Sequence, residues 1–261
     1  MRTPPFGRRT LLRSVAALSG AAATGSLTEP SFAFGEEGAF HPRVMLTGPA
    51  KWEGVRVTAP ARWSEELARR TSAPSRPRPT TVRADAPDLF AEPFVIWSGA
   101  GDGFALTPRE VSNLRRFVLL GGIVFVDDSD PATGAFNQRA RREMARVLPD
   151  QTPIAIGPEN VVFRSFYLLR RAAGRVAGPP KLEAIVRGGA VQVIFSKHDV
   201  LGALATGAGG TPAMSLEGGG EGQREEAIRL AVNVAMYVLC SNYKDDQVHA
   251  EHLMRRRGSA R

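Results

Sequence analysis

Short, almost entirely apolar runs recur along the chain, and each is bounded by glycine, proline or polar residues. They occupy residues 43–46, 94–97, 123–126, 182–186 and 191–195. Runs of this length predict strands, and a continuous apolar run such as 94–97 is typical of a parallel sheet that is buried on both faces. The last two runs flank Arg187-Gly188-Gly189-Ala190, which predicts an antiparallel pair joined by a tight turn.

Segments with apolar side chains at helical spacing separate the apolar runs. They occupy residues 60–70, 107–120, 137–148 and 224–240. The second has the strongest start signal, because Thr107 caps it, Pro108 takes the first helical position and Glu110 follows the cap by three residues. Gly121 ends it. Strands that alternate with helices predict an α/β, flavodoxin-like fold, with a mostly parallel sheet, helices on both faces and an antiparallel edge pair.

Two of these helical segments also predict which side chains are buried. In residues 60–70, Trp63 and Leu67 share one face, and the charged residues, Glu66 among them, lie on the other. Cys240 ends an apolar run in the last segment, which predicts a buried and unreactive thiol. Because it is the only cysteine, a disulfide within the chain is excluded.

Composition sets the class of protein without naming a function. The chain has 261 residues, of which 43% are hydrophobic, and this is ordinary for a globular protein. The net charge of +8 is concentrated at the two ends, and the segment between them is nearly balanced. Since no basic patch is interleaved with aromatic residues, we expect no nucleic-acid partner.

The N-terminus has the features of an export signal. Gly7-Arg8-Arg9-Thr10-Leu11-Leu12-Arg13 resembles a twin-arginine motif, and Ser31-Phe32-Ala33 offers a signal peptidase small residues. We therefore divide the chain into a signal (1–33), an arm (34–42), one α/β domain (43–243) and a basic tail (244–261). This predicts a periplasmic or exported protein, membrane-associated if the leader is retained, with no transmembrane span in the mature chain. A protein of the cell envelope is the expected partner, and the tail offers a peripheral contact.

Candidate chemistry gathers where the predicted strands end. Asp127 and Asp128 follow one strand, Asp102 follows another, and His198 and Asp199 follow a third. In an open α/β sheet the carboxyl ends of strands form the ligand-binding edge. Such a set would hold a hard cation such as Mg²⁺ or Ca²⁺, or supply an acid–base pair. The alternative is that Asp127 caps a following helix or turn, while Asp128 and its neighbour Asp130 are solvated.

Two further motifs are weaker. Residues 98–103 are glycine-rich and follow a strand, but they lack the spacing of a phosphate loop, which favours a close-packed turn. Ser196, His198 and Asp199 include the residue types of a hydrolase triad, yet residues so close in sequence rarely adopt its geometry. No motif names a cofactor.

Several stretches together resemble a bacterial family known as domain of unknown function 4159. They are residues 62–71, 88–90, 93–99, 106–110, 114–117, 121–128, 136–144, 148–150, 163–167 and 195–199. The resemblance implies a flavodoxin-like sheet related to class I glutamine amidotransferase-like domains, and members often look exported or membrane-associated. Related enzymes carry a nucleophilic cysteine after the strand that 123–126 resembles. Here Asp127, Asp128 and Ser129 follow it, so amidotransferase activity is not expected.

Two functions remain open from the sequence. The first is a non-enzymatic binding or assembly module of the cell envelope, on an amidotransferase-like scaffold that lacks the nucleophile. The second is a metal- or acid–base-dependent hydrolase that uses Asp127, Asp128 and His198. The absence of a complete catalytic set favours the first.

Overall fold

A seven-stranded sheet organises the computed structural model, which describes residues 38–258 of the chain, with side chains throughout except at 221 and 242–258. The strands are β1 (Arg43–Leu46), β2 (Thr81–Arg83), β3 (Phe94–Gly99), β4 (Ile123–Asp128), β5 (Ile154–Ile156), β6 (Leu182–Arg187) and β7 (Ala190–Ser196). Their order in the sheet is β2-β1-β3-β4-β7-β6-β5. The first five strands in that order are parallel, and β6 is antiparallel to both its neighbours. The predicted mostly parallel sheet with an antiparallel hairpin is confirmed.

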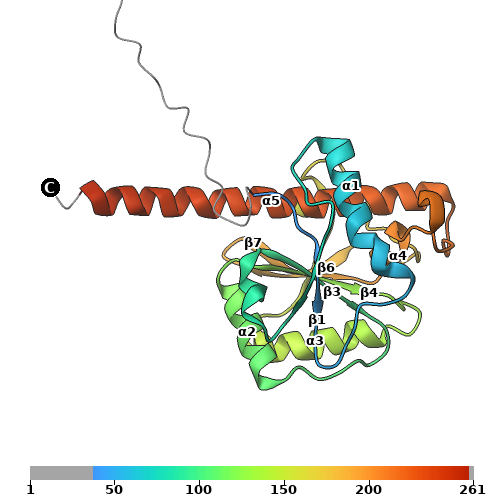
Figure 1. Ribbon diagram of the computed structural model, residues 1–261, viewed down its shortest axis with the longest axis horizontal. Coiled ribbons are helices and arrows are strands. Elements are labelled where there is room, and N and C mark those ends of the chain that lie inside the picture. Colours follow the sequence, from blue (N-terminus) through green and yellow to red (C-terminus); the bar gives the residue numbers. More distant parts are fainter. Residues whose placement is uncertain (1–37, 259–261) are drawn as a thin grey trace, which may run out of the picture. The chain divides into compact units, whose positions relative to one another are not determined.

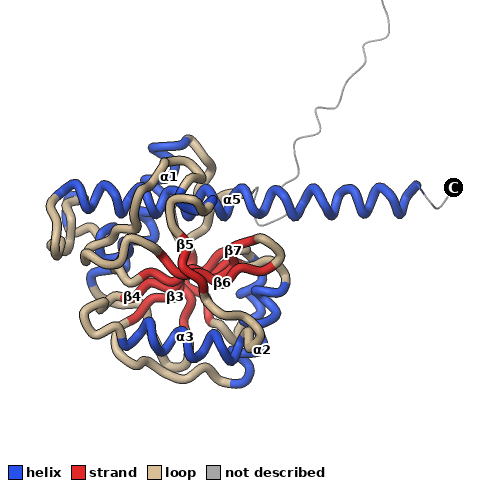
Figure 2. The backbone as a smooth tube through the Cα atoms, turned by 180° about the vertical axis from the view of Figure 1, so that it is seen from behind, coloured by secondary structure: helices blue, strands red, loops and turns tan. Residues whose placement is uncertain are grey.

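Helices cover both faces of this sheet. They are α1 (Ala59–Thr71), α2 (Pro108–Leu119), α3 (Ala135–Val147), α4 (Val200–Leu204) and α5 (Glu221–Gly258), with 3₁₀ turns η1 (Val55–Thr58), η2 (Pro87–Ala91), η3 (Val161–Phe163) and η4 (Ala208–Gly210). Helices α1, α4 and α5 lie on one face, and α2 and α3 lie on the other (Figures 1 and 2). The fold is therefore the predicted α/β, flavodoxin-like arrangement. Among the residues that the structure describes, no helix is long and apolar enough to cross a membrane.

The central strands are apolar because each of their faces packs against helices. In β4, Phe125 packs among residues of α1 and α5, whereas Val124 and Val126 pack among residues of α2 and α3. Trp63 of α1 is fully buried, lies edge-on to Phe125, and donates its indole N–H to the Ala231 carbonyl of α5 at 2.7 Å. Alternation in the strands thus builds two cores, one on each face.

The start of α2 contains the predicted capping box. Glu110 accepts the Thr107 N–H at 2.7 Å, and the Thr107 hydroxyl accepts the Glu110 N–H at 3.2 Å. The other carboxylate oxygen of Glu110 accepts the N–H of Gly48, which follows β1 and has a φ of +52°. One buried side chain therefore satisfies the end of α2 and also holds the loop after β1.

Two burial predictions were wrong. Glu66 is only 1% exposed, because arginines at neighbouring positions of α1 neutralise it within the helix. Burial disfavours its ionised form, but hydrogen bonds from Arg70 and Arg69 outweigh that effect and lower the pKa of Glu66. Cys240 is exposed, although Val238, two residues earlier in α5, is still buried in the core. The export signal 1–33 lies outside the described residues, as do the side chains of the basic tail.

Candidate functional site

The three predicted strand ends lie side by side. In the register of β3, β4 and β7, Ser98 pairs with Asp127, and Asp127 pairs with Ser196. Gly99 pairs with Asp128 in the next row. The sheet therefore brings together the ends of three strands that the sequence places far apart.

Asp127 is fully buried and caps a helix. Its two carboxylate oxygens accept the N–H groups of Val200 and Leu201 at 3.0 and 2.8 Å, at the start of α4. Burial, and next the nearby Asp199 carboxylate, raise the pKa of Asp127 to about 7. Asp127 therefore caps a helix, as anticipated. The helix that it caps is α4, which follows β7, and not the helix that comes next in the sequence after Asp127.

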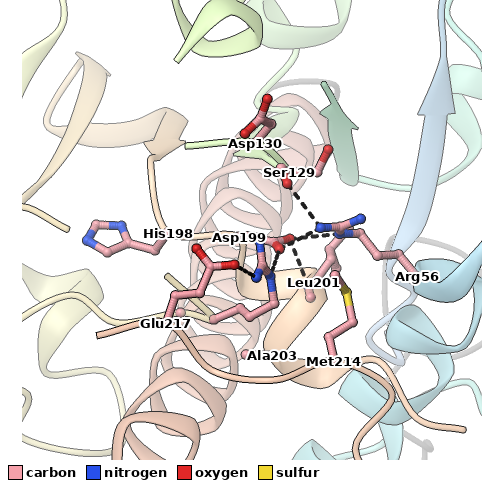
Figure 3. Close-up of polar contacts among 12 residues, drawn as sticks. Arg56, Ser129, Asp130, His198, Asp199, Leu201, Ala203, Met214 and Glu217 are labelled. Carbon is pink, nitrogen blue, oxygen red and sulfur yellow. Dashed lines mark hydrogen bonds and ion pairs between the residues drawn. The ribbon is translucent and has the colours of Figure 1, made fainter. Parts of the chain in front are cut away.

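Asp199 is the centre of a polar network between loops (Figure 3). It is fully buried, adopts the left-handed conformation with a φ of +51°, and accepts the Gly202 N–H at 2.9 Å. Arg56 of η1 donates two hydrogen bonds to the Asp199 carboxylate, at 2.8 and 2.6 Å, and a third to the Ser129 carbonyl at 3.0 Å. The Nε of Arg175 donates to the same carboxylate. The guanidinium groups of Arg56 and Arg175 therefore both bind the Asp199 carboxylate.

Asp128 and Asp102 do not join this network. Asp128 is fully buried rather than solvated. Its carboxylate accepts the N–H of Asp130 in the following loop at 3.0 Å and that of Asn137 in the first turn of α3 at 3.2 Å. Burial raises its pKa. Asp102, with a side chain 76% exposed, pairs with Arg142 at the surface. The four predicted aspartates thus separate into helix caps, an ion-pair network and one surface residue.

His198 serves the loop beside it. Its ring is buried, its Nε2 donates to the Pro179 carbonyl at 2.8 Å, and burial lowers its pKa. The ring points away from the Asp199 carboxylate (Figure 3). The Ser196 hydroxyl accepts the backbone N–H of His198 at 3.2 Å, so these residues form no triad. Among the residues whose side chains the structure describes, no group of three His, Cys, Asp or Glu is arranged to hold a metal ion.

A crevice lies at the same edge of the sheet, where β1 and β3 are neighbours. The chain leaves β1 toward α1 on one face and leaves β3 toward α2 on the other, so the two loops diverge. This is the topological switch point at which open α/β sheets bind ligands. The crevice has a volume of about 180 Å³ and is lined by Met45, Leu46, Thr47, Ala50, Lys51, Trp52, Trp97, Ser98, Gly99, Ala100, Gly103, Phe104, Phe136 and Arg139.

The polar groups of the crevice include two buried atoms without a hydrogen-bond partner. The Ser98 hydroxyl has none, and neither has the Nε of Arg139, although that atom lies 3.1 Å from a carboxylate oxygen of Glu143. Gly99 has no room for a side chain, because an added Cβ would lie 2.6 Å from the Phe136 ring. Sequence reasoning singled out the glycine-rich loop 98–103 but missed the crevice, since the loop after β1 supplies its other wall.

A larger hollow of about 490 Å³ lies at the opposite edge of the sheet, near the hairpin turn and α5. It is lined by Gly121, Ile123, Val161, Gly188, Gly189, Ala190, Val191, Gln192, Tyr237, Cys240 and Ser241. No charged side chain is among them, and the Gln192 amide and the Tyr237 hydroxyl already bind backbone atoms. The crevice therefore has the better combination of apolar walls and unpartnered polar groups.

Comparison with known proteins identifies the family and nothing more specific. A family model described as "Domain of unknown function (DUF4159)" matches residues 43–239. The match begins at the first residue of β1 and ends within α5, so it includes the whole sheet. The resemblance predicted from the motifs is confirmed. No curated protein matches the chain.

Proposed function

This chain belongs to the DUF4159 family, described as a domain of unknown function, and we propose that it is an exported, non-enzymatic binding module whose ligand occupies the crevice between β1 and β3. The observation that carries the proposal is the crevice itself. It lies at the switch point of the sheet and has aromatic walls, and one of its lining residues, Ser98, has a hydroxyl group without a hydrogen-bond partner.

The state of the buried acids supports binding over hydrolysis. Both oxygens of Asp127 accept backbone N–H groups, and two arginines occupy Asp199. A general base needs an oxygen or nitrogen that reaches the substrate, and a metal site needs several such donors together. The carboxylates of Asp127 and Asp199 are engaged within the fold, and the His198 ring is buried with its Nε2 bound to the Pro179 carbonyl. The alternative of an acid–base or metal-dependent hydrolase therefore has less support.

The proposal that the protein is exported is supported by the twin-arginine motif in residues 7–13. A double substitution, Arg8→Lys with Arg9→Lys, should leave the protein in the cytoplasm, because the twin-arginine route requires the arginine pair. Fractionation of cells that express the wild-type or the substituted chain measures this. Equal amounts of both in the periplasm would contradict export by this route, without bearing on the crevice.

Binding in the crevice is tested with a library of small fragments. We expect the full-length protein to bind fragments that contain a single ring. The substitution Trp52→Ala removes part of one wall and should weaken the binding of these fragments at least several-fold. Phe166→Ala is the matched control, since Phe166 is an aromatic residue 44% exposed and does not line the crevice. Fragments that bind the Trp52 variant as tightly as the wild type would place the ligand elsewhere.

A further inference from the structure

We propose that the ligand of the crevice is a small aromatic carboxylate, a single planar ring that carries one carboxylate group. This inference rests on the proposed function and adds the chemistry of the ligand. It follows from the size of the crevice, the nature of its walls and the presence of Arg139 among its lining residues.

The size of the crevice fits one ring. A cavity of about 150 Å³ in a protein core is large enough to hold a benzene molecule. The crevice, at about 180 Å³, exceeds this by little more than the volume of a small substituent. A drug-sized or dinucleotide ligand would need several hundred Å³. The ligand, or the part of it that enters, is therefore about the size of a substituted benzene ring.

The walls of the crevice favour a flat apolar ring. Trp97 of β3 and Phe136 of α3 are almost fully buried beneath it and lie edge-on to each other, with ring centroids 5.7 Å apart. Trp52, from the loop after β1, is half-buried, and Phe104, from the loop after β3, is 54% exposed. A bound ring would cover apolar surface on both loops. Aromatic faces and edges favour such contacts with another ring.

The two cationic residues that line the crevice are Arg139 and Lys51. The side chain of Arg139 is only 15% exposed, and its Nε has no hydrogen-bond partner. Its neighbour Glu143 is also engaged by Arg146 and by the Leu106 N–H. At the rim, Lys51 lies 3.9 Å from Glu53, and both side chains are at least three-quarters exposed. The single carboxylate of Glu143 therefore pairs with two guanidinium groups, those of Arg139 and Arg146. A ligand carboxylate beside Arg139 would give each guanidinium group a carboxylate.

Ser98 is a second polar residue among those that line the crevice. Its oxygen is buried and has no partner among the described residues, whereas buried hydroxyl groups are normally hydrogen-bonded. A ligand carboxylate beside Arg139 would accept a hydrogen bond from the guanidinium group. A second ligand oxygen would accept a hydrogen bond from the Ser98 hydroxyl. The ring matches the aromatic walls of the crevice, and the carboxylate matches its buried cationic residue, Arg139.

The test compares three probes on the full-length wild-type protein by isothermal titration calorimetry or ligand-detected NMR. Benzoate should bind about tenfold more tightly than benzamide, which has the same shape without the charge. Glucuronate, a carboxylate on a sugar ring, should bind more weakly than benzoate. Equal affinities for benzoate and benzamide would overturn the ligand class and leave the proposed function intact. A preference for glucuronate would also overturn it. If no probe or fragment binds, the proposed function fails as well.

Two variants on α3 locate the charge. Arg139→Gln should weaken the binding of benzoate about tenfold and leave the affinity for benzamide unchanged. Arg142→Gln is the matched control, because Arg142 is one turn further along the same helix and pairs with Asp102 at the surface. An equal loss of benzoate in both variants would contradict a direct contact with Arg139. The comparison of probes on the wild-type protein holds even if Arg139→Gln proves unstable.

Discussion

At the scale of residues, the acids at the strand ends act as structural caps. Their positions at the carboxyl edge could be predicted, because each follows an apolar run in the sequence. Their partners could not, since Val200 and Leu201, which Asp127 caps, lie 73 and 74 positions away. A strand-end aspartate looks the same in sequence whether it binds a ligand or a helix end. Only the packing of α4 against β4 distinguishes the two.

A substitution at Asp127 tests the capping role. Asp127→Ala should lower the free energy of unfolding by about 3 kcal/mol, because it leaves two buried N–H groups at the start of α4 without an acceptor. Urea denaturation followed by circular dichroism measures it. Asp102→Ala, at an exposed position, should change the value by less than about 0.5 kcal/mol. A stable Asp127→Ala variant would return this residue to the list of functional candidates.

The raised pKa of Asp127 also predicts how stability depends on pH. Its folded-state pKa of about 7 lies above the ordinary aspartate value of 3.8, so between these values the folded protein holds a proton that the unfolded chain has released. This group therefore makes the free energy of unfolding fall as the pH rises from about 4 to about 7. The wild-type value minus that of Asp127→Asn should decrease across this window and level off above it. A difference that stays constant or grows with pH would contradict the raised pKa.

At the scale of elements, prediction succeeded where a local signal was strong. The capping box of α2 and the glycine turn between β6 and β7 follow from a few adjacent residues. The short elements β5 and α4 were not predicted, because three and five residues give too little periodicity, and α4 depends on the distant Asp127. Glu66 was predicted on the exposed face of its helix but is buried, because neighbouring arginines neutralise its charge.

The double role of Glu110 gives a prediction for α2. Thr107→Ala removes one cap and should lower the free energy of unfolding by about 1 kcal/mol. Glu110→Ala should cost about 2 kcal/mol, because the N–H groups of both Thr107 and Gly48 lose their acceptor. Arg109→Ala, exposed in the same turn, is the control and should change little. Equal losses for the threonine and glutamate variants would mean that the contact with Gly48 contributes nothing.

At the scale of the whole molecule, the α/β class could be predicted but the order of the strands could not. The crevice exists because β1 and β3 are neighbours whose loops leave on opposite faces, and no local pattern in the sequence encodes that adjacency. Its walls combine residues from 47–52, 98–104 and α3. The site that the structure favours therefore overlaps the predicted strand ends only in the loop after β3. Partner and localisation stay predictions.

The three tryptophans provide the most direct test of the central claim that the crevice is the ligand site. Trp52 and Trp97 line it, whereas Trp63 is buried in the other core and donates its indole N–H to Ala231. We propose to titrate ¹⁵N-labelled full-length protein with benzoate and to follow the three indole N–H signals by NMR. The account predicts that the signals of Trp52 and Trp97 shift in a saturable manner while that of Trp63 stays in place. Saturable binding of benzoate, or of any fragment, that leaves the Trp52 and Trp97 signals unmoved would contradict it.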